Sequence, residues 1–300
     1  MLQADLGGAV YALGNFDGVH RGHQALIAAA QDIAAPQGLP VVALTFAPHP
    51  RRFFAPNLPP FLLSDSVQKE ELLRAAGVDD VRVMPFDAAL AALPAQDFVQ
   101  DILLKQCKAR GIVAGEDFRF GHHRGGDMAR MMAWAGSVPV QAVAPVRDGQ
   151  GQRYAASTAR ALLQAGQVKA AAHILGRPWT LRGVIAHGDK RGRELGFPTA
   201  NIALGDYLRP LYGVYAVLGR RLNDGLSLTG VANIGRRPTV DGAREWLEAH
   251  FFDFNADIYD ESWDISLIDL IRQEQRFDGF DALKAAIQAD CVRARDVLSR

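Results

Sequence analysis

The chain has 300 residues, with 33 basic and 33 acidic side chains, so its formal net charge at neutral pH is zero. This balance, without any basic run, excludes an electrostatic footprint for nucleic acid, which is not an expected partner. No apolar run approaches the roughly 20 residues of a membrane span, and the N-terminus lacks signal-peptide features, so we expect a cytoplasmic protein without membrane association. A chain of this length exceeds one compact core and favours two domains.

Short apolar runs separated by amphipathic stretches occupy the first half of the chain. We expect strands over residues 9–13, 41–46, 81–84, 111–115 and 138–143. Helices are expected from Ser64 and over a helically spaced stripe from Phe98 to Cys107. The alternation is typical of βαβ units in a parallel sheet. Polar loops follow the first, second and fourth runs, so we expect three loops to meet at the carboxyl edge of this sheet, where such folds bind ligands.

The turn between the first strand and the next helix carries glycines and two histidines. It reads Gly14-Asn15-Phe16-Asp17-Gly18-Val19-His20-Arg21-Gly22-His23. Glycines suit the tight turn, a helix N-terminus attracts phosphate, and the two imidazoles add donors, which predicts an adenylyl-transfer site. The alternative is a turn with two solvated histidines. A zinc site is disfavoured because the helical His-Glu-x-x-His pattern is absent.

The loop after the fourth strand reads Gly115-Glu116-Asp117-Phe118-Arg119-Phe120-Gly121. Phe118 and Phe120, taken singly, are typical of anchors in the core. Together with Asp117 and Arg119 they also fit the border of a planar aromatic ligand. Both interpretations stay open at this point.

The pattern changes near Pro178, where closely spaced strand signals replace the strand–helix alternation. Residues 215–218 and 226–231 flank Asn223-Asp224-Gly225, a hairpin-turn sequence, and residues 263–267 alternate as one strand. An antiparallel sheet or small barrel follows, closed by a helix whose expected apolar face is Phe280, Leu283, Ile287, Cys291 and Ala294. We therefore predict two domains, over residues 1–177 and 178–300.

A second phosphate-binding pattern lies at residues 188–201. Gly188, Gly196 and three cations precede Pro198-Thr199-Ala200-Asn201. A threonine hydroxyl and an asparagine carbonyl are hard oxygen ligands, so Thr199 and Asn201 are candidate Mg²⁺ ligands. A charged barrel loop is an equally good interpretation of this segment alone. Downstream, Glu248 and His250 share one face of an expected strand, and a carboxylate that faces a pocket can accept a hydroxyl proton during phosphoryl transfer.

The ordered motifs resemble the bacterial bifunctional riboflavin kinase/FMN adenylyltransferase family, also called FAD synthetase, over essentially the whole chain. The segments that carry the resemblance are residues 14–23, 45–50, 115–121, 196–201, 213–216, 231–239 and 247–250. The resemblance implies an N-terminal Rossmann-like nucleotidyltransferase domain that transfers AMP from ATP to FMN and releases pyrophosphate. It also implies a C-terminal six-stranded antiparallel barrel that phosphorylates riboflavin to FMN.

The resemblance also implies roles for individual residues. His20 and His23 would stabilise the ATP phosphates, Thr199 and Asn201 would serve Mg²⁺ and nucleotide, and Glu248 would be the kinase base. Arg160 is a further catalytic candidate. The other candidates for binding ATP or flavin are Gly14, Asn15, Phe16, Asp17, Gly18, Gly22, Asp117, Phe118, Arg153, Ser157, Gly188, Gly196 and Pro198. The implied partners are riboflavin, FMN, FAD and ATP, bound by a monomer or weak homo-oligomer.

One segment departs from the family pattern Arg-x-Ser-Ser-Thr-x-x-Arg, which handles ATP phosphates. Aligned without a gap, the chain keeps Arg153 and Arg160 but has Ala155, Ala156 and Ser157 at the three hydroxyl positions. A one-residue deletion is the alternative alignment. Each lost phosphate hydrogen bond would cost about 1–3 kcal/mol if buried. A riboflavin kinase with weakened or lost adenylyltransferase activity is therefore an alternative function, and a non-catalytic flavin-binding regulator is a third.

Overall fold

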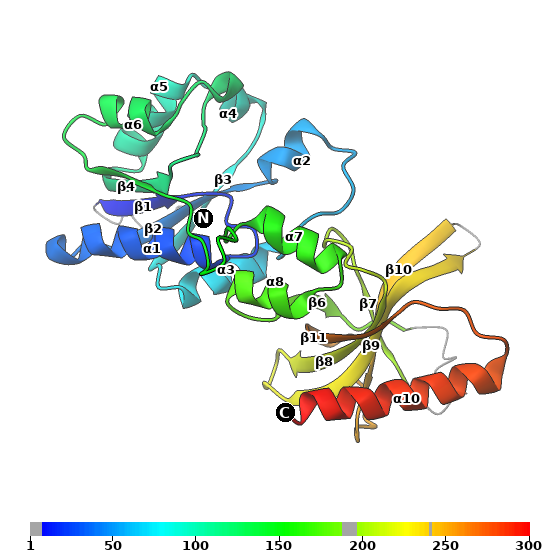
Figure 1. Cartoon of the computed structure of the whole chain (residues 1–300). Helices are drawn as coiled ribbons and strands as arrows, with labels where there is room; N and C mark the ends of the chain where they lie inside the picture. The colour runs from blue at the N-terminus through cyan, green and yellow to red at the C-terminus, as the bar shows by residue number, and fades with distance from the viewer. Residues whose placement is uncertain (1–7, 188–196, 240–241) are drawn as a thin grey trace. The chain divides into compact units, whose positions relative to one another are not determined.

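The computed structural model describes residues 8–187, 197–239 and 242–300, which divide into two compact units (Figure 1). By their contacts, residues up to 59 and from 66 to 155 form the first unit. Residues 60–65 and those from 156 onward form the second. Helices α7 (Ala156–Gln164) and α8 (Val168–Leu175) thus group with the second unit. The boundary of the functional domains near Pro178 stays a prediction.

The first unit is built on a parallel five-stranded sheet with the order β3-β2-β1-β4-β5. Its strands are β1 Ala9–Leu13, β2 Val41–Ala47, β3 Asp80–Pro85, β4 Ala109–Gly115 and β5 Val140–Val143. Leu13, the last residue of β1, lies opposite Leu44 of β2 and Ala114 of β4. The loops that follow these three strands therefore lie side by side, which confirms the predicted parallel sheet and the meeting of three loops at its carboxyl edge.

Helices cover both faces of this sheet, as Figure 1 shows. Val10 and Ala12 of β1 belong to a core with α1 (Arg21–Ala34). Tyr11 and Leu13 belong to the opposite core, with η2 (Phe98–Gln106) and α6 (Met128–Trp134). Successive side chains of a strand point to opposite faces, so a strand covered on both sides is apolar throughout. The remaining helical segments are η1 Ala35–Gln37, α2 Pro50–Phe54, α3 Ser66–Ala75, α4 Ala88–Ala92, α5 Ala95–Asp97 and η3 His122–Arg124.

The helix expected from Ser64 begins two residues later, at Ser66. The reason is that residues 60–65 belong to the second unit, where Leu62 forms an isolated bridge with Tyr207. The Leu62 amide donates to the Asp206 carbonyl at 3.1 Å, and the indole nitrogen of Trp179 donates to the Leu63 carbonyl at 2.8 Å. The capping sequence is thus overridden by a tertiary contact that no local pattern contains.

The second unit is an antiparallel sheet of six strands with the order β6-β11-β8-β9-β10-β7. Its strands are β6 Trp179–Val184, β7 Ala200–Ala203, β8 Gly213–Arg221, β9 Ser227–Thr239, β10 Gly242–Phe251 and β11 Ser262–Gln273. The two edges approach each other, because the Ala186 amide just after β6 donates to the Asn201 carbonyl of β7 at 2.8 Å. The sheet is therefore a nearly closed barrel, as predicted, and α10 (Phe280–Leu298) packs on β8, β9 and β11.

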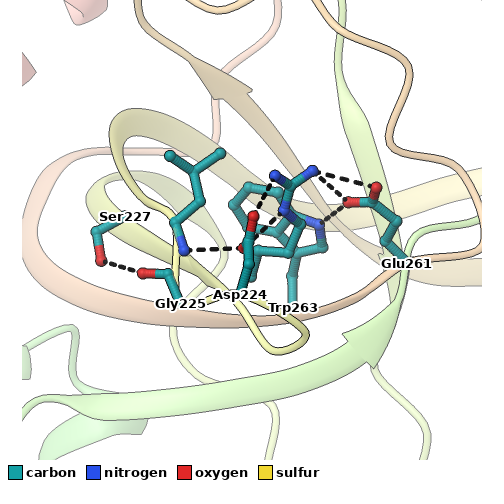
Figure 2. A network of polar contacts seen from close by, with 7 residues as sticks. Asp224, Gly225, Ser227, Glu261 and Trp263 are labelled. Carbon is teal, nitrogen blue, oxygen red and sulfur yellow. Dashed lines mark hydrogen bonds and ion pairs between the residues drawn. The ribbon is translucent and has the colours of Figure 1, made fainter.

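The predicted hairpin turn joins β8 to β9 and is held by a polar network (Figure 2). Arg221 pairs with Asp224 at 2.7 Å and with Glu261 at 3.2 Å. The indole nitrogen of Trp263 donates to Glu261 at 3.1 Å, and the Arg221 guanidinium lies over the Trp263 ring. The Asp224 carboxylate accepts hydrogen bonds from Arg221 and from the Leu226 amide, and these lower its pKa. The network ties the turn to the neighbouring strand β11.

The apolar face of α10 differs from the predicted one at its start. Phe280 is 55% exposed, whereas Ala294 is buried against Val214, Ala216 and Val231. The core that α10 covers contacts only the C-terminal half of the helix among the described residues, so the first turn has no apolar partner there.

We expect removal of the Asp290 carboxylate to destabilise the second unit. Arg272 of β11 holds Asp290 of α10 with Nη2 at 2.8 Å, and the two side chains are only 21% and 9% exposed. Asp290→Ala leaves a largely buried guanidinium without its counter-charge, which costs about 3–5 kcal/mol. Asp253→Ala is the matched control, because its ion pair with Arg295 is 78% and 49% exposed and contributes about 0–1 kcal/mol. Equal losses of unfolding free energy in urea melts would contradict this account.

Candidate active sites

The turn after β1 is tight because three of its residues adopt positive φ. Phe16 has φ of 50°, Gly18 has φ of 73° and Val19 has φ of 36°. The Phe16 ring is fully buried beneath the turn, and a Cβ on Gly14 would lie 3.2 Å from it. The backbone therefore closes over a phenyl ring, and a glycine at position 14 gives that ring room.

The two histidines of the turn stack on each other at the start of α1. Their ring centroids lie 3.6 Å apart with an interplanar angle of 21°. His20 is the N-cap residue, and its Nδ1 accepts a hydrogen bond from the His23 amide at 3.3 Å. An Nδ1 that accepts is unprotonated, so neutral His20 carries its proton on Nε2. The cap thereby orients His20 as an N–H donor.

Gly22, the second residue of α1, has no room for a side chain because another backbone segment crosses it closely. A Cβ at position 22 would lie 2.6 Å from the Tyr154 carbonyl oxygen. The Tyr154 ring also contacts Arg21, whose guanidinium carbon is 5.6 Å from the ring centroid. The histidine turn is thus packed against the segment that contains Arg153 and Tyr154, which the sequence places more than 130 residues away.

Burial keeps His23 neutral. Burial, the neighbouring His20 and the positive charge of Lys69 all lower the pKa of His23 well below 6.5. Its Nδ1 atom is buried and makes no hydrogen bond within the residues that the structure describes. A neutral imidazole with a spare buried nitrogen is suited to contact a ligand at this position.

Lys69 of α3 is a residue that the sequence analysis did not single out. Its ammonium Nζ lies 3.3 Å from the Thr45 hydroxyl, and burial lowers its pKa while Asp17 raises it. The missed signal is helical spacing, because Lys69 lies three and four residues before Leu72 and Leu73 on the expected apolar face. A lysine at an apolar-face position is a departure from the pattern of a core helix.

Asp117 and Arg153 are joined at the carboxyl edge of the sheet. The Arg153 guanidinium pairs with the Asp117 carboxylate at 2.5 Å. In the same loop Phe120 is buried in the core and Phe118 is partly buried against it, which favours the interpretation as anchors. Asn15, by contrast, is exposed beside the turn.

Ser157 and Arg160 lie on α7, among the residues of the second unit. Ser157 is exposed, and the Arg160 Nε donates to the Phe61 carbonyl at 2.8 Å.

In the second unit, Glu248 stands in a row of polar residues across three strands. Asn201 of β7 and Asn233 of β9 are its direct partners on either side of β10. Directly opposed residues of antiparallel strands share one face of the sheet, so the three side chains start from the same face. Asn233 is a second residue to which the sequence analysis gave no role. The row joins the predicted metal ligand to the predicted base.

The segment before β7 is held against β10. His250 Nδ1 lies 2.9 Å from the Pro198 carbonyl oxygen, and the Phe197 ring meets the His250 ring edge to face. The Asn201 amide nitrogen donates to the Thr199 carbonyl at 3.2 Å, which directs the amide oxygen away from the backbone. The Thr199 hydroxyl and the Asn201 amide oxygen are hard oxygen donors of the kind that fits Mg²⁺. Gly188 and Gly196 lie outside the described residues.

Taken together, a neutral imidazole pair on a parallel-sheet edge and a carboxylate row on a small barrel define a protein with two sites for nucleotide phosphate chemistry. The FAD synthetase family model matches residues 2–158, and the riboflavin kinase family model matches residues 175–298. The bifunctional riboflavin kinase/FMN adenylyltransferase of Escherichia coli K12 is 40% identical over 297 residues, covering 98% of this chain and 94% of its own. The chain belongs to the bifunctional riboflavin kinase/FMN adenylyltransferase family, as the motifs predicted.

More distant relatives agree in length and order of parts. The protein of the same description from Bacillus subtilis is 35% identical over 291 residues, covering 94% of this chain and 90% of its own. A crystal structure from Streptococcus pneumoniae, described as a macrolide-efflux protein, has a TM-score of 0.84 at 34% identity and covers 94% of this chain and 92% of that one. Among the described residues of our chain, no helix has the length and apolar character needed to cross a bilayer.

Proposed function

We propose that this chain phosphorylates riboflavin to FMN at its barrel and adenylylates FMN to FAD at its parallel-sheet edge. Both family models and the near full-length relatives support the pair of activities. The observation that carries the assignment of residues is the stacked, neutral His20–His23 pair at the N-terminus of α1.

In the adenylylation step, an FMN phosphate oxygen attacks the α-phosphorus of ATP and the bond to pyrophosphate breaks. Negative charge develops on the α-phosphoryl oxygens and on the leaving oxygen. Neutral N–H donors fixed in advance stabilise this charge without reorganisation, and we assign that role to His20 and His23. The loop residues 14–18 and the Asp117–Arg153 pair would border the nucleotide and the flavin, with Gly22 leaving room for the Tyr154 backbone.

In the kinase step, the ribityl hydroxyl of riboflavin attacks the γ-phosphorus of ATP, the bond from that phosphorus to the bridging oxygen breaks, and ADP leaves. We assign Glu248 to accept the hydroxyl proton, and Thr199 and Asn201 to hold Mg²⁺ beside the nucleotide, next to Pro198. When bound, Mg²⁺ neutralises charge on the ATP phosphates. The shared face of Asn201 and Glu248 supports this arrangement. We further propose that the protein works in the cytoplasm as a monomer or weak homo-oligomer, without nucleic acid.

The test of this proposal is a time course. Purified protein is incubated with riboflavin, ATP and Mg²⁺, and riboflavin, FMN and FAD are separated by chromatography. FMN that appears first and is then converted to FAD supports both assignments. FMN that accumulates without FAD supports the second candidate, a kinase with a weakened adenylyltransferase. Flavin binding without ATP turnover would leave the non-catalytic regulator.

The second candidate rests on Ala155 and Ala156, which stand where relatives carry hydroxyls in the pattern above. Ala155 immediately precedes α7, which begins at Ala156. We expect Ala155→Ser/Ala156→Ser to raise the rate of FAD formation about ten- to a hundredfold, because one or two regained phosphate hydrogen bonds are worth about 1–3 kcal/mol each.

A serine at position 155 would also cap α7, which by itself adds about 1 kcal/mol of stability. Thermal melts of Ala155→Ser alone separate the two effects, because capping raises the melting temperature without changing the KM for ATP. An unchanged rate and an unchanged KM in the double variant would contradict a phosphate role for this segment.

A further inference from the structure

Lys69 is a cation held inside the histidine site by a helix that otherwise serves the core. Its ammonium donates to the Thr45 hydroxyl at 3.3 Å, and that hydroxyl in turn donates to the Asn15 carbonyl at 3.2 Å. Thr45 is fully buried on β2, so this relay is rigid at its centre. It connects α3, β2 and the turn after β1, and it places the ammonium on the side of the turn that carries the histidines.

The surroundings of Lys69 do not satisfy its hydrogen-bonding capacity. An ammonium group has three N–H donors. Within the residues that the structure describes, its contact with Thr45 is the one hydrogen bond that Lys69 makes, and no carboxylate forms an ion pair with it. The charge of the buried Asp17 carboxylate raises the pKa of Lys69, and the charge of Lys69 lowers the pKa of His23. Lys69 interacts with both groups only through longer-range electrostatics. A structural lysine at such a position would pair directly with a carboxylate, whereas this one keeps donors for a ligand.

The reaction at this site calls for a positive charge that the histidines do not supply. His23 is neutral. His20 accepts a hydrogen bond at Nδ1, which requires the neutral ring with its proton on Nε2. Two neutral imidazoles offer N–H donors but no formal charge. FMN and ATP together bring several negative charges, and the bond between the α-phosphorus and pyrophosphate breaks with its electron pair going to the leaving oxygen. Lys69 is placed to offset that charge.

We propose that Lys69 binds a substrate phosphate in the adenylylation site and supplies formal positive charge there, with Thr45 fixing its position. The proposal rests on the assignment of FMN adenylylation to the first unit. The ligand is a phosphate group of either FMN or ATP, and the two sources differ in which affinity depends on Lys69.

The experiment compares Lys69→Met, which keeps the length of the side chain without its charge, with Lys69→Arg, which keeps the charge. Lys105→Met is the control, since Lys105 is a lysine of the same unit with a side chain 76% exposed. For each variant we would measure FAD formation from FMN and ATP, riboflavin phosphorylation, and binding of inorganic pyrophosphate by calorimetry. Because riboflavin phosphorylation belongs to the other unit, it reports in the same tube that the second unit is folded and active, and recovery in Lys69→Arg shows that the first unit is folded.

We expect Lys69→Met to lower kcat/KM for FAD formation about 10²–10³-fold, the range for loss of one preorganised charge-stabilising group. Lys69→Arg should recover at least a tenth of the wild-type value, and Lys105→Met and all kinase rates should stay within twofold. Weaker pyrophosphate binding with a raised KM for ATP assigns the contact to ATP, and a raised KM for FMN alone assigns it to the FMN phosphate.

Two results would overturn the proposal. One is FAD formation by Lys69→Met within threefold of the wild-type rate. The other is an equal loss in Lys69→Met and Lys69→Arg with unchanged pyrophosphate binding, which would indicate a packing role. If wild-type protein and Lys105→Met both fail to make FAD while phosphorylating riboflavin, the assigned function of the first unit fails instead, and pyrophosphate binding alone then decides the role of Lys69.

Discussion

Glu248→Gln should abolish most riboflavin phosphorylation while FAD formation from supplied FMN continues. A positioned general base contributes about 10²–10⁴-fold, and the amide keeps the size and hydrogen-bonding capacity of the side chain but cannot accept the hydroxyl proton. Glu248 lies between Asn201 and Asn233 in the register of the barrel, so the substitution changes one member of a row without adding bulk. We therefore expect kcat to fall by that factor with little change in KM.

The measurement is steady-state FMN formation with riboflavin and ATP each varied. Asp253→Asn is the control for the second unit, because its carboxylate is 78% exposed and paired only with Arg295 among the described residues. A residual activity above a tenth of wild type would remove Glu248 from the role of base.

His20→Asn should lower FAD formation about 10²–10³-fold and leave riboflavin phosphorylation unchanged. The His20 side chain does two things, because its Nδ1 caps α1 and its Nε2 is the donor assigned to phosphate. Asparagine is among the best N-cap residues, so its side-chain oxygen can accept from the His23 amide, but it has no atom at the position of Nε2. The substitution separates the cap from the donor.

His20→Ala is the matched variant, since it removes both the cap and the donor. We expect it to lose about 1 kcal/mol more stability than His20→Asn and to lose FAD formation to the same extent. Thermal melts and initial rates of FAD formation measure the two effects. If His20→Asn forms FAD at the wild-type rate while His20→Ala does not, the histidine serves only as a helix cap.

Local sequence patterns were sufficient to predict most helices and strands and to locate the motifs of the two candidate sites. Alternation of apolar and polar residues over Leu247, Glu248, Ala249 and His250 predicts a strand, and the structure has β10 there. The glycines of the first turn predict close packing, and the structure shows the contacts that make Gly14 and Gly22 necessary. Gly14 packs against the Phe16 ring of the same motif, whereas Gly22 packs against the Tyr154 backbone, more than 130 residues away, so only the first of these contacts is local.

Other features depended on pairs of segments whose meeting no local pattern encodes. A helix is expected from Ser64, yet α3 begins at Ser66, because Leu62 is hydrogen-bonded to the backbone of Asp206 and Leu208. The stripe from Phe98 to Cys107 is helical but winds more widely, with the Cys107 amide bonded to the Ile102 carbonyl five residues back. The exposed Phe280 shows that a helix face is decided by how far the partner core extends.

The same division holds for the candidate sites. The sequence by itself determined the family, the two kinds of phosphate chemistry and the identities of His20, His23 and Glu248 as candidates, because these depend on motif order. Only the tertiary structure decided that Lys69 and Thr45 belong beside the histidines and that Asn233 stands next to Glu248. Sheet order and strand register bring these residues together, and both are set by packing between segments that are far apart along the chain.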